Sequence, residues 1–393
     1  MNKDIFVHDY GGYPFTYQLA AKLSERYKVT YIYCSGSGSS KGNKYSDEVG
    51  LKCIDLMNKP VDKANFIKRF FDEFNYGKKL KDLVSSSHVD VMLSANTPTI
   101  PQYIVQNYCK KNNIKFVFWL QDIISVAARS VFLKKNKILS EIIYMIWAFF
   151  ESRALRNSNS VITITEDFNK YMKKWNVADS KIFCIPNWSS IDDIPLKDKA
   201  NDFSKRLNIA GTFNIIYSGT LGYKHNPDIL YNAAVKLEAE NAIMFVIISE
   251  GLGANRLKEL NSRHSLNNLI ILPYQPYELL PEVLGSADLI ISILEPSAGL
   301  FSVPSKVWTG FCAGRASLLL VPKDNLAAKI TTAINAGVII DNENISKLVE
   351  TILFLKSNPD LLKQYGINAR KYAEENFNID LITENFEKIL DLD

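Results

Sequence analysis

The feature of this sequence that most limits its fold is a regular alternation of apolar, strand-like runs with helix-like segments. Continuous apolar strands that alternate with helices are typical of a parallel sheet covered on both faces. We therefore predict a doubly wound α/β domain in the first half of the chain. Its expected strands are residues 5–8, 29–33, 89–93, 115–120 and 160–165.

The alternation stops at a polar segment and then begins again. Residues 188–203 contain no strand-like run, and we interpret them as a linker between domains. A chain of 393 residues is long enough for two cores. We therefore predict two α/β domains, residues 1–190 and 204–375. The expected strands of the second are residues 213–217, 242–248, 268–272, 288–294, 316–321 and 337–340.

Composition and charge exclude several classes of protein. With 47% hydrophobic and 22% charged residues, the chain is neither disordered nor collagen-like. A net charge of +4 gives no argument for a nucleic-acid partner. The five cysteines are scattered without a CxxC pair, which argues against disulfides or structural zinc and favours a cytoplasmic protein. We expect neither a signal peptide nor a membrane span.

Glycine-rich turns follow several strands, at the edge where open α/β sheets bind ligands. The most informative turn is residues 218–224, in which Ser218, Gly219 and Thr220 precede Lys224. Glycines let the backbone approach a ligand, free N–H groups at a helix start favour phosphate, and a lysine adds positive charge. The alternative is a plain tight turn with a solvated lysine.

Two further turns of the second domain suggest an anionic ligand. Glu250 and Gly251 follow a strand in a GxG pattern that lacks the third glycine of the dinucleotide fingerprint. Ser305 and Lys306 follow Pro304 at a predicted helix start, where they would form an anion cradle. The alternatives are a strand-to-helix turn in the first case and an ordinary helix cap in the second.

The first domain offers two candidate residues at strand ends. Gly12 lies in the first strand-to-helix loop and would let a phosphate approach the backbone, unless the turn is required by geometry alone. Asp122 ends the strand at 115–120, where a carboxylate would accept a proton or hold an acceptor hydroxyl. The alternative for Asp122 is an N-cap of the next helix.

One helix is unusually apolar. Nine apolar residues, 142–150, follow a basic segment at 134–137, and the run is too short to cross a bilayer. Such a helix could lie on an anionic membrane surface. The alternative is a helix buried in the core.

Together these segments resemble the GT-B fold retaining glycosyltransferases, close to glycosyltransferase family 4. The resemblance covers nearly the whole chain, and its most specific blocks are SGTLGYKHNPDIL, SEGLG, VPSKVWTGFCAGRAS and LLKQYGINARKYAEENF. The VPSK form is similar to the bacterial subgroup that builds O-antigen, capsule and colanic-acid polysaccharides, including fucosamine-transferase-like members.

The resemblance implies two Rossmann-like domains that face each other across a cleft. The second would bind a nucleotide-sugar donor and the first an acceptor, and a final helix at about 376–393 would return to the first domain. Asp122 and Lys224 would be catalytic. The implied donor-binding residues are Gly12, Ser218, Gly219, Thr220, Lys224, Glu250, Gly251, Tyr274, Gln275, Glu295, Ser305 and Lys306.

The sequence departs from this family at one point. Many relatives carry two glutamates separated by seven residues, whereas here Glu295 is followed at that spacing by Val303. The resemblance otherwise implies retention of stereochemistry, no metal or other cofactor, and a polyprenyl-diphosphate-linked saccharide acceptor at the cytoplasmic face of the membrane. Two other functions remain open, a GT-B sugar-nucleotide 2-epimerase and a non-catalytic GT-B binding module.

Overall fold

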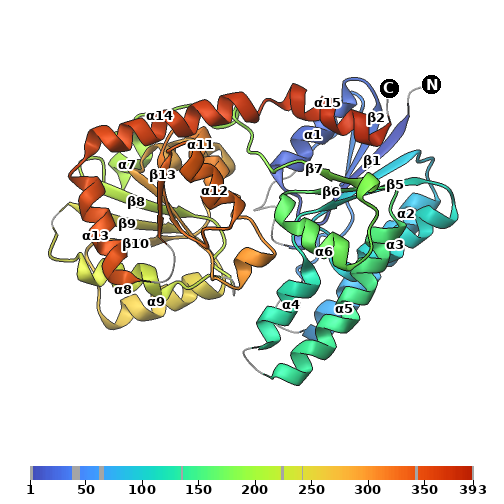
Figure 1. The fold of residues 1–393 in the computed structure, drawn as a ribbon. Helices are drawn as coiled ribbons and strands as arrows, with labels where there is room; N and C mark the ends of the chain where they lie inside the picture. The colour runs from blue at the N-terminus through green and yellow to red at the C-terminus, as the bar shows by residue number, and fades with distance from the viewer. Residues whose placement is uncertain are drawn as a thin grey trace. The chain divides into compact units, whose positions relative to one another are not determined.

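The computed structural model describes residues 3–37, 45–61, 66–133, 136–222, 225–240, 242–340 and 344–391. The chain divides into two compact units (Figure 1). The first comprises residues 1–187 and 379–393, and the second comprises residues 188–378. Each is an α/β unit built on a parallel sheet, which confirms the predicted fold class.

The sheet of the first unit has the strand order β3-β2-β1-β4-β5-β6-β7. Its named strands pair in parallel, and Ile5 of β1 is aligned with Val29 of β2 and with Val91 of β4. The direction of winding reverses between β1 and β4, and ligands bind at such a switch point in open α/β sheets. The strands are β1 (Asp4–Asp9), β2 (Lys28–Tyr33), β3 (Leu51–Asp55), β4 (Val91–Ala95), β5 (Lys115–Leu120), β6 (Ser160–Thr163) and β7 (Ile182–Cys184).

Helices flank this sheet, and the last helix of the chain is one of them. Pro14 opens α1, a position where its missing N–H leaves no bond unmade. Phe386 of the last helix is fully buried, and its ring centroid lies 4.8 Å from that of Trp119 in β5. The helices of the unit are α1 (Pro14–Ser24), α2 (Phe66–Ser85), α3 (Thr99–Lys111), α4 (Ile124–Leu133), α5 (Lys137–Asn157), α6 (Asn169–Lys174) and α15 (Ile379–Leu390).

The sheet of the second unit has the order β10-β9-β8-β11-β12-β13, again with parallel pairs. Its switch point lies between β8 and β11. The strands are β8 (Phe213–Ser218), β9 (Ile243–Ile248), β10 (Leu269–Leu272), β11 (Leu289–Ile293), β12 (Ala316–Leu320) and β13 (Gly337–Ile340). The helices are α7 (Asp202–Arg206), α8 (Asp228–Lys236), α9 (Leu252–Arg263), α10 (Leu280–Gly285), α11 (Lys306–Cys312), α12 (Leu326–Ala333), α13 (Ile345–Lys356) and α14 (Pro359–Asn376).

The segment that the sequence suggested as a linker packs as part of the second unit. Residues 188–203 form no strand, as expected, but Trp188, Ile194 and Phe203 are buried. Arg370 of α14 also donates a hydrogen bond to the Ile194 carbonyl at 3.0 Å. The polar composition of the segment therefore concealed three apolar anchors.

Among the described residues, none of the helices combines the length and the hydropathy that a membrane crossing requires.

Candidate functional site

The turn after β8 brings Gly219 and Lys306 together in the second unit. Gly219 has a φ of +138°, which side-chain-bearing residues rarely adopt. A Cβ added there would lie 2.6 Å from Cε of Lys306, so the absence of a side chain makes room for the lysine. The Lys306 ammonium also lies 4.9 Å from the ring centroid of Tyr217, within cation–π range. A positive charge is thus held beside a glycine turn at the carboxyl end of β8.

A second group of predicted residues meets beside the same turn. The hydroxyls of Thr220 and Tyr274 lie 2.7 Å apart, and the Tyr274 N–H donates to the Glu250 carboxylate at 3.2 Å. Burial raises the pKa of Tyr274, and the Glu250 charge acts in the same direction. Ser249 links the two turns, because its hydroxyl accepts a bond from the Leu221 N–H at 3.1 Å. Three strand ends, those of β8, β9 and β10, therefore contribute to one polar group.

The remaining predicted residues of the second unit lie along the same strand ends. Gly251, with a φ of +91°, directly precedes α9. The Gln275 side chain donates to the Pro273 carbonyl at 3.0 Å within its own turn. Glu295 follows β11, and its backbone carbonyl accepts from the Ala298 N–H at 2.8 Å.

Ser305 directly precedes α11 and is exposed, and its side chain makes no capping hydrogen bond. Ser305 is thus the N-cap residue of α11, as the alternative of an ordinary helix cap has it, although the cap lacks a side-chain hydrogen bond. Ser218 ends β8 next to Gly219. Lys224 lies outside the described residues, so its predicted role stays a prediction.

In the first unit, Asp9 organises the loop that contains Gly12. Asp9 is fully buried at the end of β1, and its carboxylate accepts from the N–H groups of Gly11 at 2.8 Å and Tyr13 at 2.9 Å. The Thr16 hydroxyl donates to the same carboxylate. Burial raises the pKa of Asp9 to about 6, although these hydrogen bonds oppose the rise. Gly12 follows with a φ of +61°, so the loop at this strand end is fixed by one buried carboxylate.

His8 lies beside Asp9 in a buried network of neutral groups. Its Nδ1 is 2.8 Å from the Ser94 hydroxyl, and its Nε2 is 2.9 Å from the Tyr76 hydroxyl. Ser94 donates to the Gln102 side chain at 2.6 Å, so it accepts from His8, which places the proton on Nδ1 and lets Nε2 accept from Tyr76. Burial lowers the pKa of His8 to about 3. The imidazole is therefore neutral at physiological pH.

Sequence reasoning missed both Asp9 and His8. A histidine and an aspartate at the end of the first strand, next to Gly11 and Gly12, were the available signal. His8 is the last residue but one of β1. Its two ring nitrogens are both engaged inside the unit.

Asp122 follows β5 and is half-buried. The preceding residue, Gln121, accepts a hydrogen bond from the side chain of Asn187. Two N–H groups at the start of α4, those of Ile124 and Ser125, donate to Glu151 of α5 at 2.9 and 3.1 Å. Glu151, which the sequence did not suggest, therefore takes on a helix-capping role of the kind considered for Asp122.

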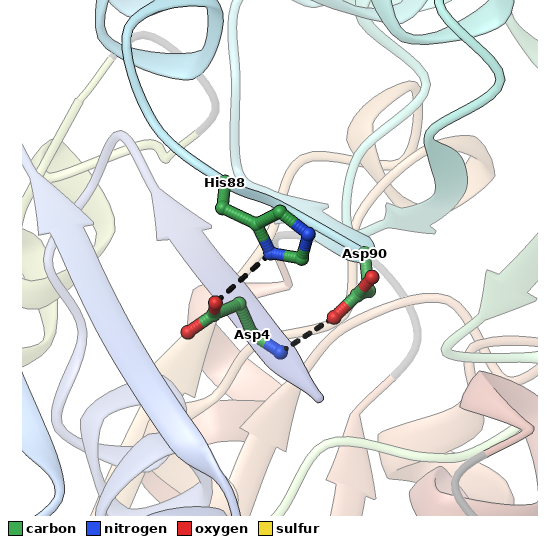
Figure 2. Close-up of side chains that lie close together, drawn as sticks. All are labelled: Asp4, His88 and Asp90. Atoms are coloured by element: carbon green, nitrogen blue, oxygen red, sulfur yellow. Dashed lines mark hydrogen bonds and ion pairs between the residues drawn. The ribbon is translucent and has the colours of Figure 1, made fainter. Parts of the chain in front are cut away.

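Three side chains that could bind a metal lie together at the amino ends of the strands of the first sheet (Figure 2). One ligand atom each of Asp4, His88 and Asp90 lies within 4.8 Å of the others, among the residues that the structure describes. Asp4 begins β1 and Asp90 directly precedes β4, so the cluster is at the amino ends of the strands. Lys28 pairs with Asp4 at 2.8 Å, and Asp90 accepts the Asp4 N–H at 2.8 Å. These bonds account for the arrangement without an ion.

Comparison with known proteins agrees with this architecture. Residues 198–296 match the family Glycosyl transferases group 1. The sucrose-phosphate synthase tll1590 of Thermosynechococcus elongatus is 12% identical, with a TM-score of 0.77 over 99% of this chain and 98% of that chain. Anabaena Alr3699/HepE, solved in complex with UDP and glucose, is 13% identical, with a TM-score of 0.73 over 100% of both chains. The chain therefore has the GT-B fold, and residues 198–296 are similar to the group 1 glycosyltransferases.

A curated relative is similar over part of its length. It is WcaI of Escherichia coli (strain K12), named "Putative colanic acid biosynthesis glycosyl transferase", which is 28% identical over 243 residues. The match covers 60% of this chain and 58% of WcaI, so the chain spans a little over half of that relative.

Proposed function

We propose that this protein is a glycosyltransferase that moves a sugar from a nucleotide-sugar donor to a saccharide carried on a polyprenyl diphosphate, in the synthesis of a bacterial surface polysaccharide. The observation that carries the proposal is the approach of Lys306 to Gly219 at the carboxyl end of β8. A lysine beside a glycine turn is suited to a diphosphate, because backbone and ammonium both reach it. The name of WcaI supports the surface-polysaccharide part.

The chemistry of this transfer needs positive charge at the leaving group. As the bond between the sugar and the diphosphate breaks, negative charge grows on the nucleoside diphosphate, and fixed cations stabilise it. In the proposed mechanism Lys306 supplies this charge and Lys224 adds to it, so that the reaction does not require a metal. Tyr274 and Gln275 would contact the base, and Glu250 and Glu295 would lie near the donor. Retention of configuration is proposed on the family resemblance.

The first unit would supply the acceptor side. Asp122 would hold the acceptor hydroxyl or take its proton, since a carboxylate at a strand end can do either. Gly12 would let a phosphate group approach the backbone of the loop that Asp9 fixes. The saccharide class and the linkage remain for the transfer assay to identify.

The outer face of α5 supports a membrane-bound acceptor. The outward side chains on this helix are apolar over three turns, and Ile138 and Met145 are 74% and 60% exposed. The exposed apolar side chains of the helix are Ile138, Leu139, Ile142, Met145, Ile146 and Phe149. The expectation of a helix buried all round in the core is therefore wrong, because only the other face of α5 packs inside.

The charges that follow this apolar face are basic. Arg153 and Arg156 continue the same side of α5 in its last turns and are exposed, and Lys174 of α6 bonds to the Tyr144 hydroxyl at 2.8 Å. An apolar helix face flanked by arginine and lysine is suited to the interface of an anionic membrane. We propose that α5 brings the first unit to the lipid-linked acceptor.

A thermal-shift screen tests donor binding. UDP-, GDP-, ADP- and dTDP-sugars are added to the wild-type protein, to Lys306→Ala and to Lys236→Ala, an exposed lysine of α8. One donor at a hundred times its Kd should stabilise the wild type and the Lys236 variant by about 2.7 kcal/mol, and Lys306→Ala much less. The proposal fails if none of the four stabilises the protein or if Lys306→Ala binds as well as the wild type.

A second assay separates transfer from the other GT-B functions. The stabilising donor is incubated with and without anionic vesicles that carry a polyprenyl-diphosphate-linked saccharide. Transfer to the lipid supports the proposal. An epimer formed from the donor alone would instead identify an epimerase, and binding without any product would identify a non-catalytic module.

A further inference from the structure

Glu151 occupies an unusual place for an acidic residue. It lies on α5 and is 2% exposed, on the side of the helix opposite the apolar outer face. Its two carboxylate oxygens each accept a backbone hydrogen bond from the preceding helix, α4, one from Ile124 at 2.9 Å and one from Ser125 at 3.1 Å. These N–H groups belong to the first turn of α4, which has no intrahelical partners for them. Glu151 is therefore a cap supplied by a neighbouring helix.

The same helix pair is joined a second time, at its far end. Ser140 of α5 donates to the Arg129 carbonyl of α4 at 2.8 Å, and the Arg129 side chain donates to Glu141 at 2.8 Å. The helices α4 and α5 thus form a hairpin (Figure 1) that is fixed at both ends, with Glu151 at the end where α4 begins. Asp122 precedes the first residue of α4 by two positions.

We propose that Glu151 is a positioning residue, which ties the outward apolar face of the α4–α5 hairpin to the strand end that carries Asp122. Because α4 and α5 are joined at both ends, a displacement of the outer face of α5 also displaces the first turn of α4, through the hydrogen bonds to the Glu151 carboxylate. Binding of the hairpin to an anionic membrane then orders the Asp122 loop. The roles of Asp122 and of the apolar face in this inference rest on the proposed function. The two hydrogen bonds from Ile124 and Ser125 to Glu151, which we call the clamp, do not.

The electrostatics of the clamp agree with its position. Burial raises the pKa of Glu151 to about 7, the bonds from Ser125 and Ile124 oppose that rise, and the charge of Asp122 adds to it. The charge of Asp122 thus acts on the Glu151 carboxyl, as expected when the two side chains are close neighbours.

Hydrogen exchange tests the clamp directly. It is measured by mass spectrometry on residues 121–133 of the whole protein, as wild type, Glu151→Gln and Glu141→Gln. In Glu151→Gln one amide N–H of the side chain faces a backbone N–H, so exchange at 121–126 should be faster by about tenfold. Glu141→Gln, which alters the other join, should leave 121–126 unchanged. Equal exchange in wild type and Glu151→Gln would overturn the inference.

Vesicles that contain anionic phosphatidylglycerol test the coupling. In the wild type, vesicle binding should slow exchange at 121–126 severalfold, whereas in Glu151→Gln it should protect α5 but not 121–126. A merely structural role for Glu151 would leave the vesicle-induced protection of 121–126 in place, and that result would overturn the coupling.

The two kinds of failure can be told apart. If vesicles protect no part of α5 in the wild type, the proposed membrane contact fails, and with it the coupling, while the clamp is still judged by the exchange of Glu151→Gln without vesicles. If Glu151→Gln does not fold, Glu151→Asp, which keeps the charge on a shorter side chain, replaces it. Faster exchange at 121–126 with an unchanged global melting temperature supports the clamp in either variant, and unchanged exchange contradicts it.

Discussion

The two units organise the carboxyl ends of their strands by different means. In the first unit, buried ionisable side chains fix the loops, since Asp9 holds the turn after β1 and Glu151 holds the start of α4. In the second unit, glycines, hydroxyls and the exposed carboxylate of Glu250 shape the turns, and Lys306 lies beside Gly219. The loops at the carboxyl ends of the first sheet should therefore respond to pH, whereas those of the second sheet are suited to an anion.

This difference matches the tasks proposed for the two units. A diphosphate is a common ligand, and a glycine turn with a lysine binds it whatever sugar is attached. Acceptors differ between enzymes, so we expect each loop around the acceptor to be fixed by its own side chain, as Asp9 and Glu151 fix theirs. Four predictions test this contrast.

The largest effect is expected in the turn after β8, where Lys306 lies close to Gly219. Gly219→Ala places a side chain at a φ of +138° and against Lys306, so both turn and lysine must move. We expect kcat/KM for the donor to fall of the order of a thousandfold. The matched control is Gly211→Ala, since a Cβ there would meet no atom within 4 Å. Normal activity in Gly219→Ala would show that this turn does not bind the donor.

The next effect concerns the buried carboxylate of the first edge. The pKa of Asp9 rises from an ordinary 3.8 to about 6, so its contribution to folding is fully present below about pH 4 and is lost as pH rises through 6. The unfolding free energy of the wild type minus that of Asp9→Asn should fall by about 2 kcal/mol between pH 4 and pH 7. Chemical denaturation over that range measures it. A difference that stays constant with pH, or rises, contradicts the assignment.

A smaller effect is expected on the outer face of α5. Ile142→Glu should weaken binding to anionic vesicles by about tenfold, because one apolar side chain is lost from the interface and a negative charge is added. Since Ile142 is exposed, the melting temperature should hardly change. Val235→Glu on α8, also exposed, is the control in the second unit. Sedimentation with vesicles measures the binding of both variants. Equal binding by Ile142→Glu and Val235→Glu would contradict the proposal that α5 contacts the membrane.

The smallest effect concerns the cluster at the amino ends of the first sheet. Because Lys28 and a backbone N–H already engage Asp4 and Asp90, adding Zn²⁺ or Mn²⁺ should leave the melting temperature of the wild type within about 1 °C. Asp4→Asn serves as the comparison. Stabilisation by metal in the wild type that Asp4→Asn abolishes would reveal a metal site there.

Much of the fold could be predicted from the sequence, and the exceptions have a physical reason. The strands at 115–120 and 337–340 were predicted with the bounds observed, because their apolar runs stand out. The strands β3 and β7 were missed. Both are edge strands of the first sheet, and much of each is exposed; β3 mixes apolar with polar residues, and β7 is only three residues long.

The candidate site was less accessible to sequence reasoning. A glycine-rich turn after a strand-like run is visible in the local sequence, so Gly219 and Gly251 could be singled out. The contact of Gly219 with Lys306 joins residues far apart in the chain and exists only once β8 and α11 are packed. Glu151 likewise meets Ile124 and Ser125 only when α4 and α5 fold back on each other. A single glutamate directly after an apolar run gave no sign of its partners.

The central claim is that the glycine turn after β8 and Lys306 hold a nucleoside diphosphate. The most direct measurement is a crystal structure of the protein with the donor nucleotide selected by the thermal-shift screen. The account predicts the diphosphate within hydrogen-bonding distance of Lys306 Nζ and of the backbone at Gly219 and Thr220. A well-ordered nucleotide bound elsewhere, with Lys306 remote from its phosphates, would contradict it.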